Sequence, residues 1–326
     1  MRLAFLLFVA SILLLGTGRL SAAEDDQRVL TWRGCGISKK AFMEHAAQVY
    51  QQETGVIVSL SGGGATLGIQ AAAEGGADFG GTCRHCLEVE GECEMPLALT
   101  LVAWDALAVI AHPSNPVDGI TVDQLKRVLT QQVTNWNELG GPDLPIVVVA
   151  RKGKTSGVGA MLREQILNDS EFEFGPRVLR LQSSGPVEEL VESVPGALAV
   201  TGISSARRRS VKALALDGAV PDAKQIASGR YPYYRPLYLA HAPELTGEQA
   251  LFRNWLLGAC GQAAVADAGT VNLAAGLRLM GSFRAFGDVE QITNHDALMK
   301  RWKVLEAELT ARDARGDNIV KDAGKR

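Results

Sequence analysis

The stretch RVLTWRGCGISKKAFMEHAAQVYQQETGVIVSLSGGGAT, residues 28–66, decides the fold of this chain. Its first five residues predict a β-strand, and residues 56–60 predict a second one. Between the two strands, residues 39–53 place apolar side chains at helical spacing, with Ser38 as the N-cap and Gly55 as the C-terminal stop. A strand, a helix and a strand in such close succession predict an α/β unit with parallel strands.

The same alternation continues along the rest of the chain. Short apolar runs predict buried strands at residues 107–110, 145–150 and 198–200. Helical spacing predicts helices over residues 66–74, 122–130, 157–167, 187–192 and 249–268, the last of them interrupted near Gly258. We therefore expect helices layered on a mainly parallel sheet, with helix N-termini that face a common cleft.

The N-terminus has the parts of a secretory signal peptide. A basic residue, Arg2, precedes the apolar run 3–15, which is too short to span a bilayer, and the small residues 21–23 follow as a cleavage site. We expect residues 1–23 to be removed and the mature protein to be soluble in the periplasm.

Composition and charge narrow the classes of function. The chain is 47% hydrophobic and 21% charged, as ordinary globular proteins are. A net charge of −3 offers no general attraction for nucleic acid or an acidic membrane, so any anion needs a local site. No Ser/His/Asp order or His-Glu-x-x-His spacing indicates hydrolysis. We predict no enzyme activity, no cofactor and no bound metal.

Three turns rich in glycine and hydroxyl residues each lead into a predicted helix: 34–38, 61–66 and 153–157. Helix N-termini present unpaired N–H groups and a positive dipole end, so converging turns would form an oxyanion cradle. For each turn alone, an ordinary N-cap explains the residues equally well. Arg151 ends a predicted strand just before the third turn, where a guanidinium can hold two oxygens of a tetrahedral anion.

Two other groups of basic residues have two interpretations each. Lys39 and Lys40 stand in the first turn of their helix, where a positive side chain is unfavourable unless an anion binds nearby. Solvated lysines are the alternative interpretation. The run 207–209, three arginines, predicts a solvated turn or a contact with a membrane partner.

The five cysteines are Cys35, Cys83, Cys86, Cys93 and Cys260, an odd number for an exported chain. Disulfides among Cys83, Cys86 and Cys93 are one interpretation. A thiol site of Cys35, Cys83 and Cys86, with the neighbouring histidine, for arsenite or a soft metal is the second. Redox catalysis through Cys83 and Cys86 is the third. Covalent haem is excluded because a leucine, not a histidine, follows Cys86.

Over residues 30–273 the sequence resembles the periplasmic phosphate-binding proteins of ABC transporters. The most specific segment runs from ITVDQL at 120–125 to VTNWNEL at 133–139. The shorter segments that are also similar are ADFG at 77–80, VPGALA at 194–199, PLYL at 236–239 and FRNW at 252–255.

The resemblance implies an anion site on matching positions. It covers Ile37 and Ser38 in the first loop, Ala65 and Thr66 in the second, Arg151, and the loop Thr155, Ser156 and Gly157. Where family members that select phosphate place an aspartate, which accepts a hydrogen bond from protonated phosphate, this chain has Cys83 followed by Arg84. These two residues are therefore expected to alter the selectivity.

The resemblance also implies the architecture. We expect a type II periplasmic binding protein fold: residues 24–105 with 236–284 form one lobe, residues 106–235 form the other, and the ligand cleft lies between them. Residues 285–326 would be a C-terminal helical extension. The implied function is capture of an oxyanion, phosphate first, by a monomer that serves an ABC permease or a membrane sensor. The alternative is a thiol-based arsenite or soft-metal sensor protein that feeds a membrane sensor kinase.

Overall fold

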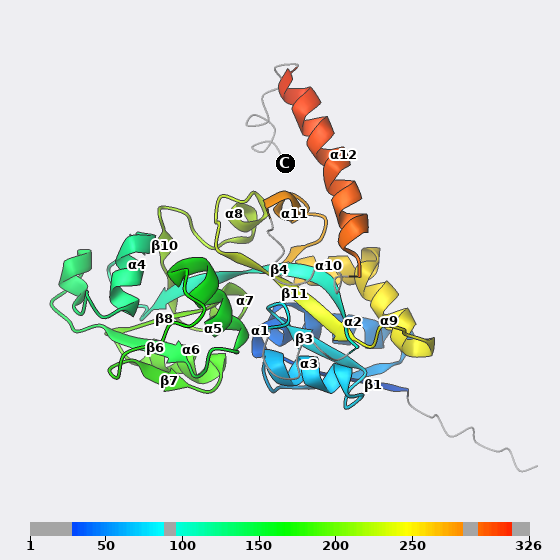
Figure 1. The fold of residues 1–326 in the computed structure, drawn as a ribbon, viewed down its shortest axis with the longest axis horizontal. Helices are drawn as coiled ribbons and strands as arrows, with labels where there is room; N and C mark the ends of the chain where they lie inside the picture. The colour runs from blue at the N-terminus through cyan, green and yellow to red at the C-terminus, as the bar shows by residue number, and fades with distance from the viewer. Residues whose placement is uncertain (1–27, 88–95, 283–292, 315–326) are drawn as a thin grey trace, which may run out of the picture.

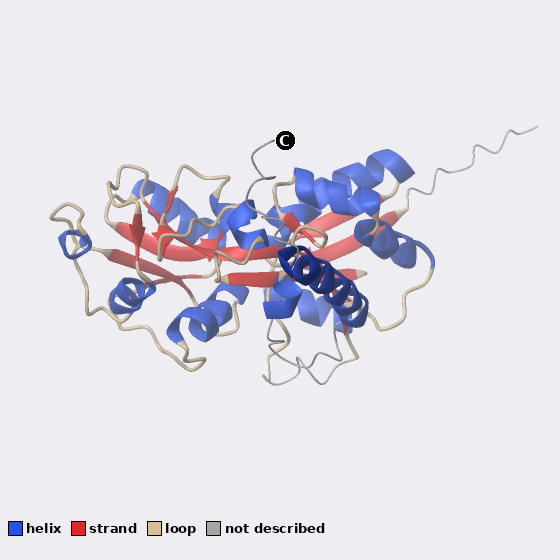
Figure 2. Cartoon of the chain, turned by 90° about the horizontal axis from the view of Figure 1, so that it is seen from above, coloured by secondary structure: helices blue, strands red, loops and turns tan. Residues whose placement is uncertain are grey.

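The structure is a computed structural model that describes residues 28–87, 96–282 and 293–314. Two groups of helices and strands lie side by side along one twisted sheet (Figure 1). Seen from above, helices cover both faces of that sheet (Figure 2). The predicted two-lobed α/β fold is confirmed. The predicted signal peptide lies outside the described residues.

Ten strands make up the main sheet, in the order β2-β1-β3-β11-β4-β8-β6-β7, with β9 and β12 added beside β4. Their bounds are β1 (Val29–Gly34), β2 (Ile57–Ser61), β3 (Phe79–Thr82), β4 (Ala98–Ala111), β6 (Val147–Arg151), β7 (Leu179–Leu181), β8 (Ala197–Gly202), β9 (Lys212–Ala213), β11 (Tyr234–His241) and β12 (Val271–Asn272). Strands β5 (Gly119–Ile120) and β10 (Ala215–Leu216) pair separately.

The sheet is parallel at both ends and antiparallel in the middle. Strand β1 runs parallel to β2 and β3, and β6 runs parallel to β7 and β8. Strands β4 and β11 are antiparallel to each other, β11 is antiparallel to β3, and β4 to β8. The expectation of a mainly parallel sheet therefore holds for the outer strands only.

Strand β4 joins the two lobes. Its 14 residues are all buried, so the apolar run at 107–110 is only the second part of a longer strand. Residues 98–106 of β4 pair with β11, and residues 107–111 pair with β8. One continuous strand thus belongs to the sheets of both lobes.

The helices fill the connections between strands. Their bounds are α1 (Gly36–Ser38), α2 (Glu44–Thr54), α3 (Ala65–Ala73), α4 (Val122–Leu129), α5 (Gly157–Leu162), α6 (Ser184–Ser193), α7 (Ile203–Ala206), α8 (Ala223–Ala227), α9 (Gly247–Leu257), α10 (Ala259–Asp267), α11 (Leu279–Ser282) and α12 (His295–Ala314). Residues Lys39–Met43 and Arg163–Leu167 are π-helical, and Trp136–Leu139 is a 3₁₀ turn. Helix α2 ends at Gly55 with φ 75°, as predicted.

The first helix begins earlier than predicted, and its N-cap is Cys35 rather than Ser38. The pairing of β1 with β3 continues to the Cys35 amide, which donates to the Gly81 carbonyl at 2.9 Å. The chain turns into the helix directly after that bond. The Cys35 sulfur then accepts the hydrogen bond of the Ser38 amide at 3.3 Å, so a thiol takes the position in which a hydroxyl was expected.

The core of the first lobe contains a cluster of aromatic rings from distant segments. Tyr50 on α2 lies edge-on to Phe252 on α9, with ring centroids 4.9 Å apart, and Phe79 on β3 lies 5.3 Å from Phe252. In the second lobe, Trp136 is fully buried and donates its indole N–H to the Gly196 carbonyl at 3.0 Å. The VTNWNEL segment therefore anchors that lobe.

Helix α12 projects away from the two lobes (Figure 1). It lies within the predicted helical extension, of which residues 285–292 and 315–326 are outside the described part of the chain. No helix in the described ranges has both the length and the apolar character needed to cross a bilayer.

Candidate functional site

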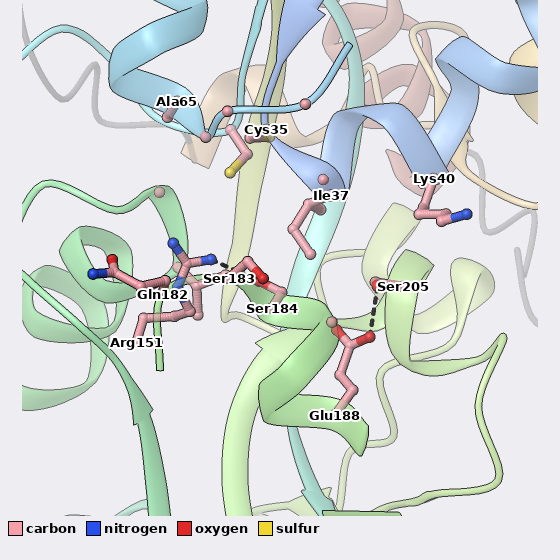
Figure 3. A pocket seen from close by; sticks show the side chains of 18 of the residues that line it. Cys35, Ile37, Lys40, Ala65, Arg151, Gln182, Ser183, Ser184, Glu188 and Ser205 are labelled. Carbon is pink, nitrogen blue, oxygen red and sulfur yellow. Dashed lines mark hydrogen bonds between the residues drawn. The ribbon is translucent and has the colours of Figure 1, made fainter. Parts of the chain in front are cut away.

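A cavity of about 460 Å³ lies where the two lobes meet (Figure 3). From the first lobe it is lined by the ends of β1 and β3 and by the loop between β2 and α3. From the second lobe it is lined by the end of β6, the start of α5, the loop between β7 and α6, and α7. These lining segments follow the carboxyl ends of parallel strands or begin helices, which is where ligands bind in open α/β sheets.

Arg151 is the cation at the centre of the second lobe's wall. One of its terminal nitrogens, Nη1, donates to the Ser184 hydroxyl at 3.3 Å, and its Nε is buried without a hydrogen-bond partner. Burial lowers the pKa of Arg151, because a charged guanidinium loses hydration there. Among the residues that the structure describes, no carboxylate forms an ion pair with it. Its charge is therefore left for a ligand to balance.

Other cations of the cavity already have carboxylate partners. Arg208 lies 2.9 Å from Glu44, and Lys40 lies 3.1 Å from the same carboxylate. Arg209 lies 2.9 Å from Glu189. The arginine run 207–209 was predicted to be a solvated turn; residues 207 and 208 do form an exposed turn, and Arg208 and Arg209 also line the cavity.

One carboxylate, Glu188 on α6, also lines the cavity. It accepts hydrogen bonds from the Thr201 hydroxyl at 2.6 Å and the Ser205 hydroxyl at 2.7 Å. Burial raises the pKa of Glu188, because desolvation disfavours its charged form. Its oxygens are thus held by protein hydroxyls, of which that of Ser205 is seen in Figure 3.

Two helix N-termini reach the cavity without side-chain caps. Helix α6 has Ser183 as its N-cap, whose side chain accepts no hydrogen bond from the helix, and α3 has Gly64, which has no side chain to cap it. Their first-turn N–H groups are therefore available to an anion, and the helix dipoles favour negative charge at the same place.

Half of the predicted ligand residues line the cavity: Ile37, Ala65, Cys83, Arg151 and Gly157. The other five, Ser38, Thr66, Arg84, Thr155 and Ser156, are not among its lining residues.

The polar groups of these five make bonds within the protein. The Ser38 hydroxyl lies 3.1 Å from the Cys35 sulfur, and the Ser156 hydroxyl caps α5 by accepting the Gly159 amide at 3.1 Å. Arg84 is fully buried, and its guanidinium donates to the Thr155 carbonyl at 2.8 Å and the Thr66 hydroxyl at 2.9 Å. Since Thr155 stands in the second lobe, Arg84 bridges the two sides of the cleft.

Sequence reasoning missed the loop Gln182–Gly185, which brings Ser183 and Ser184 to Arg151. The preceding strand, β7, is three residues long and mostly exposed, so it has no apolar run to reveal it. The sequence QSSGP at 182–186 did contain the signal, because hydroxyl residues and glycine followed by an early proline are typical of a helix start.

A buried ion pair below the cavity was also missed. Arg235 on β11 lies 3.0 Å from Asp105 on β4, and both side chains are 0% exposed. The other Asp105 oxygen accepts from the Ser204 hydroxyl at 2.7 Å and its amide at 3.0 Å. The pair connects the two central strands next to the point where β4 passes from one lobe to the other, so it belongs to the framework of the cleft.

Cys35 and Cys83 both line the cavity and are free thiols. The Arg235 Nη1 lies 3.6 Å from the Cys83 sulfur. Burial raises the pKa of Cys35, but hydrogen bonds from Cys83 and Ser38 and the charge of Arg235 outweigh it and bring the pKa to about 6. The hydrogen bond to Cys35, together with burial, raises the pKa of Cys83 well above its usual range.

The structure also bears on the predictions of a disulfide and of a thiol site for a soft metal. No disulfide joins Cys83, which is a free thiol, and Cys93 lies outside the described residues. Cys86 is buried but is not a lining residue of the cavity, and Cys260 is exposed. Within the described ranges, no three His, Cys, Asp or Glu side chains gather as metal ligands.

Comparisons with known proteins agree with this architecture. The model of the family described as PBP superfamily domain matches residues 22–257. The phosphate-binding protein PstS of Bacillus subtilis is 28% identical over 227 residues, which are 70% of this chain and 74% of that protein. PstS of Pseudomonas aeruginosa is 29% identical over 248 residues, covering 68% of this chain and 75% of that one.

Solved structures give the same result. A substrate-binding protein assigned to phosphate ABC transport, from Clostridium perfringens and with bound phosphate, superposes with a TM-score of 0.68 at 28% identity, over 75% of this chain and 99% of that one. An ABC-type phosphate transport receptor from Vibrio cholerae gives 0.55 at 27% identity, over 74% and 99%. With the family model spanning most of its length, this chain belongs to the PBP superfamily.

Proposed function

We propose that this protein captures phosphate in the cleft between its lobes and presents it to an ABC-type permease. One observation carries the proposal: Arg151 lines the cavity with a buried Nε that has no partner and a charge that no carboxylate in the described residues balances. A buried cation of this kind is costly unless an anion pairs with it. The named relatives bind phosphate, and they favour this function over the thiol-based sensor.

The anion would bind through charge and N–H groups rather than through many side chains. Arg151 would hold two oxygens with Nε and a terminal nitrogen, and the Ser184 hydroxyl would donate to a third. The open N-termini of α3 and α6 would supply backbone N–H groups from opposite lobes. Because the donors come from both lobes, binding would hold the cleft closed, as in hinge-type binding proteins.

The remaining features of the proposal follow from the same arrangement. Residues 24–105 with 236–284 would move against residues 106–235 about the central strands β4 and β11. The protein would act as a monomer in the periplasm after loss of residues 1–23, and it would bind and release phosphate without chemical change.

The test is isothermal titration of the purified protein with phosphate, compared with the Arg151→Ala variant. We expect wild type to bind one phosphate and the variant to lose roughly 100-fold in affinity, since hydrogen bonds to a charged group contribute about 1.5–3 kcal/mol. Arg208→Ala is the matched control, because Arg208 already pairs with Glu44. Its affinity should change by at most about threefold. Equal losses in the two variants would refute the assignment of Arg151.

A further inference from the structure

Two cysteine sulfurs face the proposed phosphate cleft from neighbouring strand ends. Cys35 follows β1 and Cys83 follows β3, and these strands pair in parallel with Gly34 opposite Gly81. The Cys35 amide donates to the Gly81 carbonyl at 2.9 Å, which holds the two strand ends together, and both thiols line the same cavity. They therefore form a dithiol inside the ligand cleft, close to Arg151, whose charge both sulfurs influence.

The residues around Cys35 and Cys83 favour the thiolate form, which bonds to soft metal or metalloid atoms. Cys35 is 5% and Cys83 1% exposed, so bulk water has little access to either sulfur. The Ser38 amide and hydroxyl lie 3.3 and 3.1 Å from the Cys35 sulfur, and Arg235 lies 3.6 Å from the Cys83 sulfur. Hydrogen bonds and a nearby cation stabilise a thiolate, which is the nucleophilic and metal-binding form of cysteine.

The number of donors limits what this site can hold. A structural zinc site needs four protein ligands, and the described residues bring no third cysteine, histidine or carboxylate to the pair. A centre that is satisfied by two sulfurs and retains one oxygen of its own fits better. Trivalent arsenic meets this description, and thiolates are the ligands that soft centres prefer.

We propose that Cys35 and Cys83 form a second ligand site in the cleft, which binds arsenite through two sulfur–arsenic bonds. The Cys35 thiolate displaces one hydroxide from As(OH)₃, and that hydroxide takes the Cys83 proton and leaves as water. The Cys83 sulfur then displaces a second hydroxide, which takes a proton from solvent and leaves as water. Arsenic stays trivalent and keeps one hydroxyl, so the step needs no oxidant or reductant.

The two ligand sites share one cavity but differ in what they require. Phosphate is an anion that depends on Arg151, whereas arsenite is neutral at neutral pH and depends on the sulfurs. The thiol site stands on the cysteine geometry alone, and only competition between the two ligands rests on the proposed phosphate function.

The experiment is isothermal titration of sodium arsenite into the fully reduced protein, with the thiols counted beforehand. We expect one arsenite per chain, with affinity reduced by about tenfold or more in both Cys35→Ser and Cys83→Ser, because each removes one of two bonds. Cys260→Ser is the matched control, since Cys260 is an exposed free thiol outside the cavity, and it should bind arsenite as wild type does.

The same variants titrated with phosphate separate the two sites. Arg151→Ala should lose phosphate and keep arsenite, whereas Cys35→Ser should lose arsenite and still bind phosphate, with an affinity within about 1 kcal/mol of wild type, which also shows that it folds. Wild-type arsenite affinity in both cysteine variants, or no arsenite binding by reduced wild type, would overturn the proposal. Absence of phosphate binding by wild type would refute the proposed function and leave the thiol site standing.

Discussion

Arg151 and Arg235 are both buried arginines near the centre of the molecule, but their surroundings are opposite. Arg235 lies against Asp105 at 3.0 Å, and both side chains are completely buried. Arg151 borders the cavity and donates to the Ser184 hydroxyl at 3.3 Å, and no carboxylate among the described residues forms an ion pair with it. This difference indicates that Arg235 stabilises the framework of the cleft, whereas Arg151 is placed to bind a ligand.

The physical basis is the cost of removing a charge from water. A buried ion pair recovers part of that cost from its own attraction and hydrogen bonds, so Asp105 already balances the charge of Arg235, although the Nε of Arg235, like that of Arg151, has no hydrogen-bond partner. Arg151 recovers little of it inside the protein, and a bound anion would supply the rest. Sequence alone cannot separate these two roles, because the partner of Arg235, Asp105, stands 130 positions away along the chain.

The largest expected effect comes from breaking the paired arginine. Asp105→Ala leaves the Arg235 charge buried and unbalanced and removes the acceptor of Ser204. We expect the free energy of unfolding to fall by about 3–5 kcal/mol, measured by urea denaturation. Adding Arg235→Met to this variant should recover most of the loss, since no buried charge remains. A double variant as unstable as the single one would show that the charge is not the cause.

The contact between the lobes gives the next largest effect. A Cβ on Gly157 would lie 2.3 Å from the Cys83 sulfur, so Gly157→Ala forces the two lobes apart next to Arg151. We expect phosphate binding to weaken by about 1–3 kcal/mol, the usual cost of overpacking, as measured by isothermal titration. Because Cys83→Ala removes the clashing sulfur, the double variant should regain most of the affinity. No rescue would mean that Gly157 acts through its backbone instead.

A smaller effect of opposite sign should follow from replacing the unpaired arginine. Arg151→Met removes a partly desolvated charge and retains much of the apolar stem, so the ligand-free protein should become more stable by about 1 kcal/mol. Thermal unfolding without phosphate measures this change. Phosphate should then no longer raise the melting temperature. Destabilisation as large as that of Asp105→Ala would place Arg151 in the framework with Arg235.

The sequence predicted most of the helices and strands around the cleft but fewer of the residues that line its cavity. Alternating strand and helix signals located β1, β2, α3, β6 and α5, and the predicted ligand residues Arg151, at the end of β6, and Gly157, at the start of α5, both line the cavity. Such signals are local, since each depends on the spacing of apolar side chains within one element.

The missed features depend on contacts between distant segments. The Arg84 bridge joins residues 71 positions apart, and the Arg235–Asp105 pair joins residues 130 positions apart. The N-cap of α1 moved to Cys35 because β3 pairs with the chain just before it. A predicted hydroxyl donor such as Ser38 was therefore already bonded within the protein, which spacing along the chain could not indicate.

The smallest expected effect concerns the negative charge that opposes Arg151 in the same cavity. With a pKa of about 6, Cys35 is a neutral thiol in more acidic solution and a thiolate at neutral pH. The thiolate should repel phosphate, so wild-type affinity relative to Cys35→Ser should fall by roughly 1 kcal/mol as the pH rises through that value. Both proteins meet the same phosphate species, so the ratio of their dissociation constants cancels the ligand's own ionisation. A ratio that stays constant from about pH 5 to 8 would mean that Cys35 keeps its proton or that phosphate binds beyond its reach. In either case Arg151 would act in the cleft without an opposing charge.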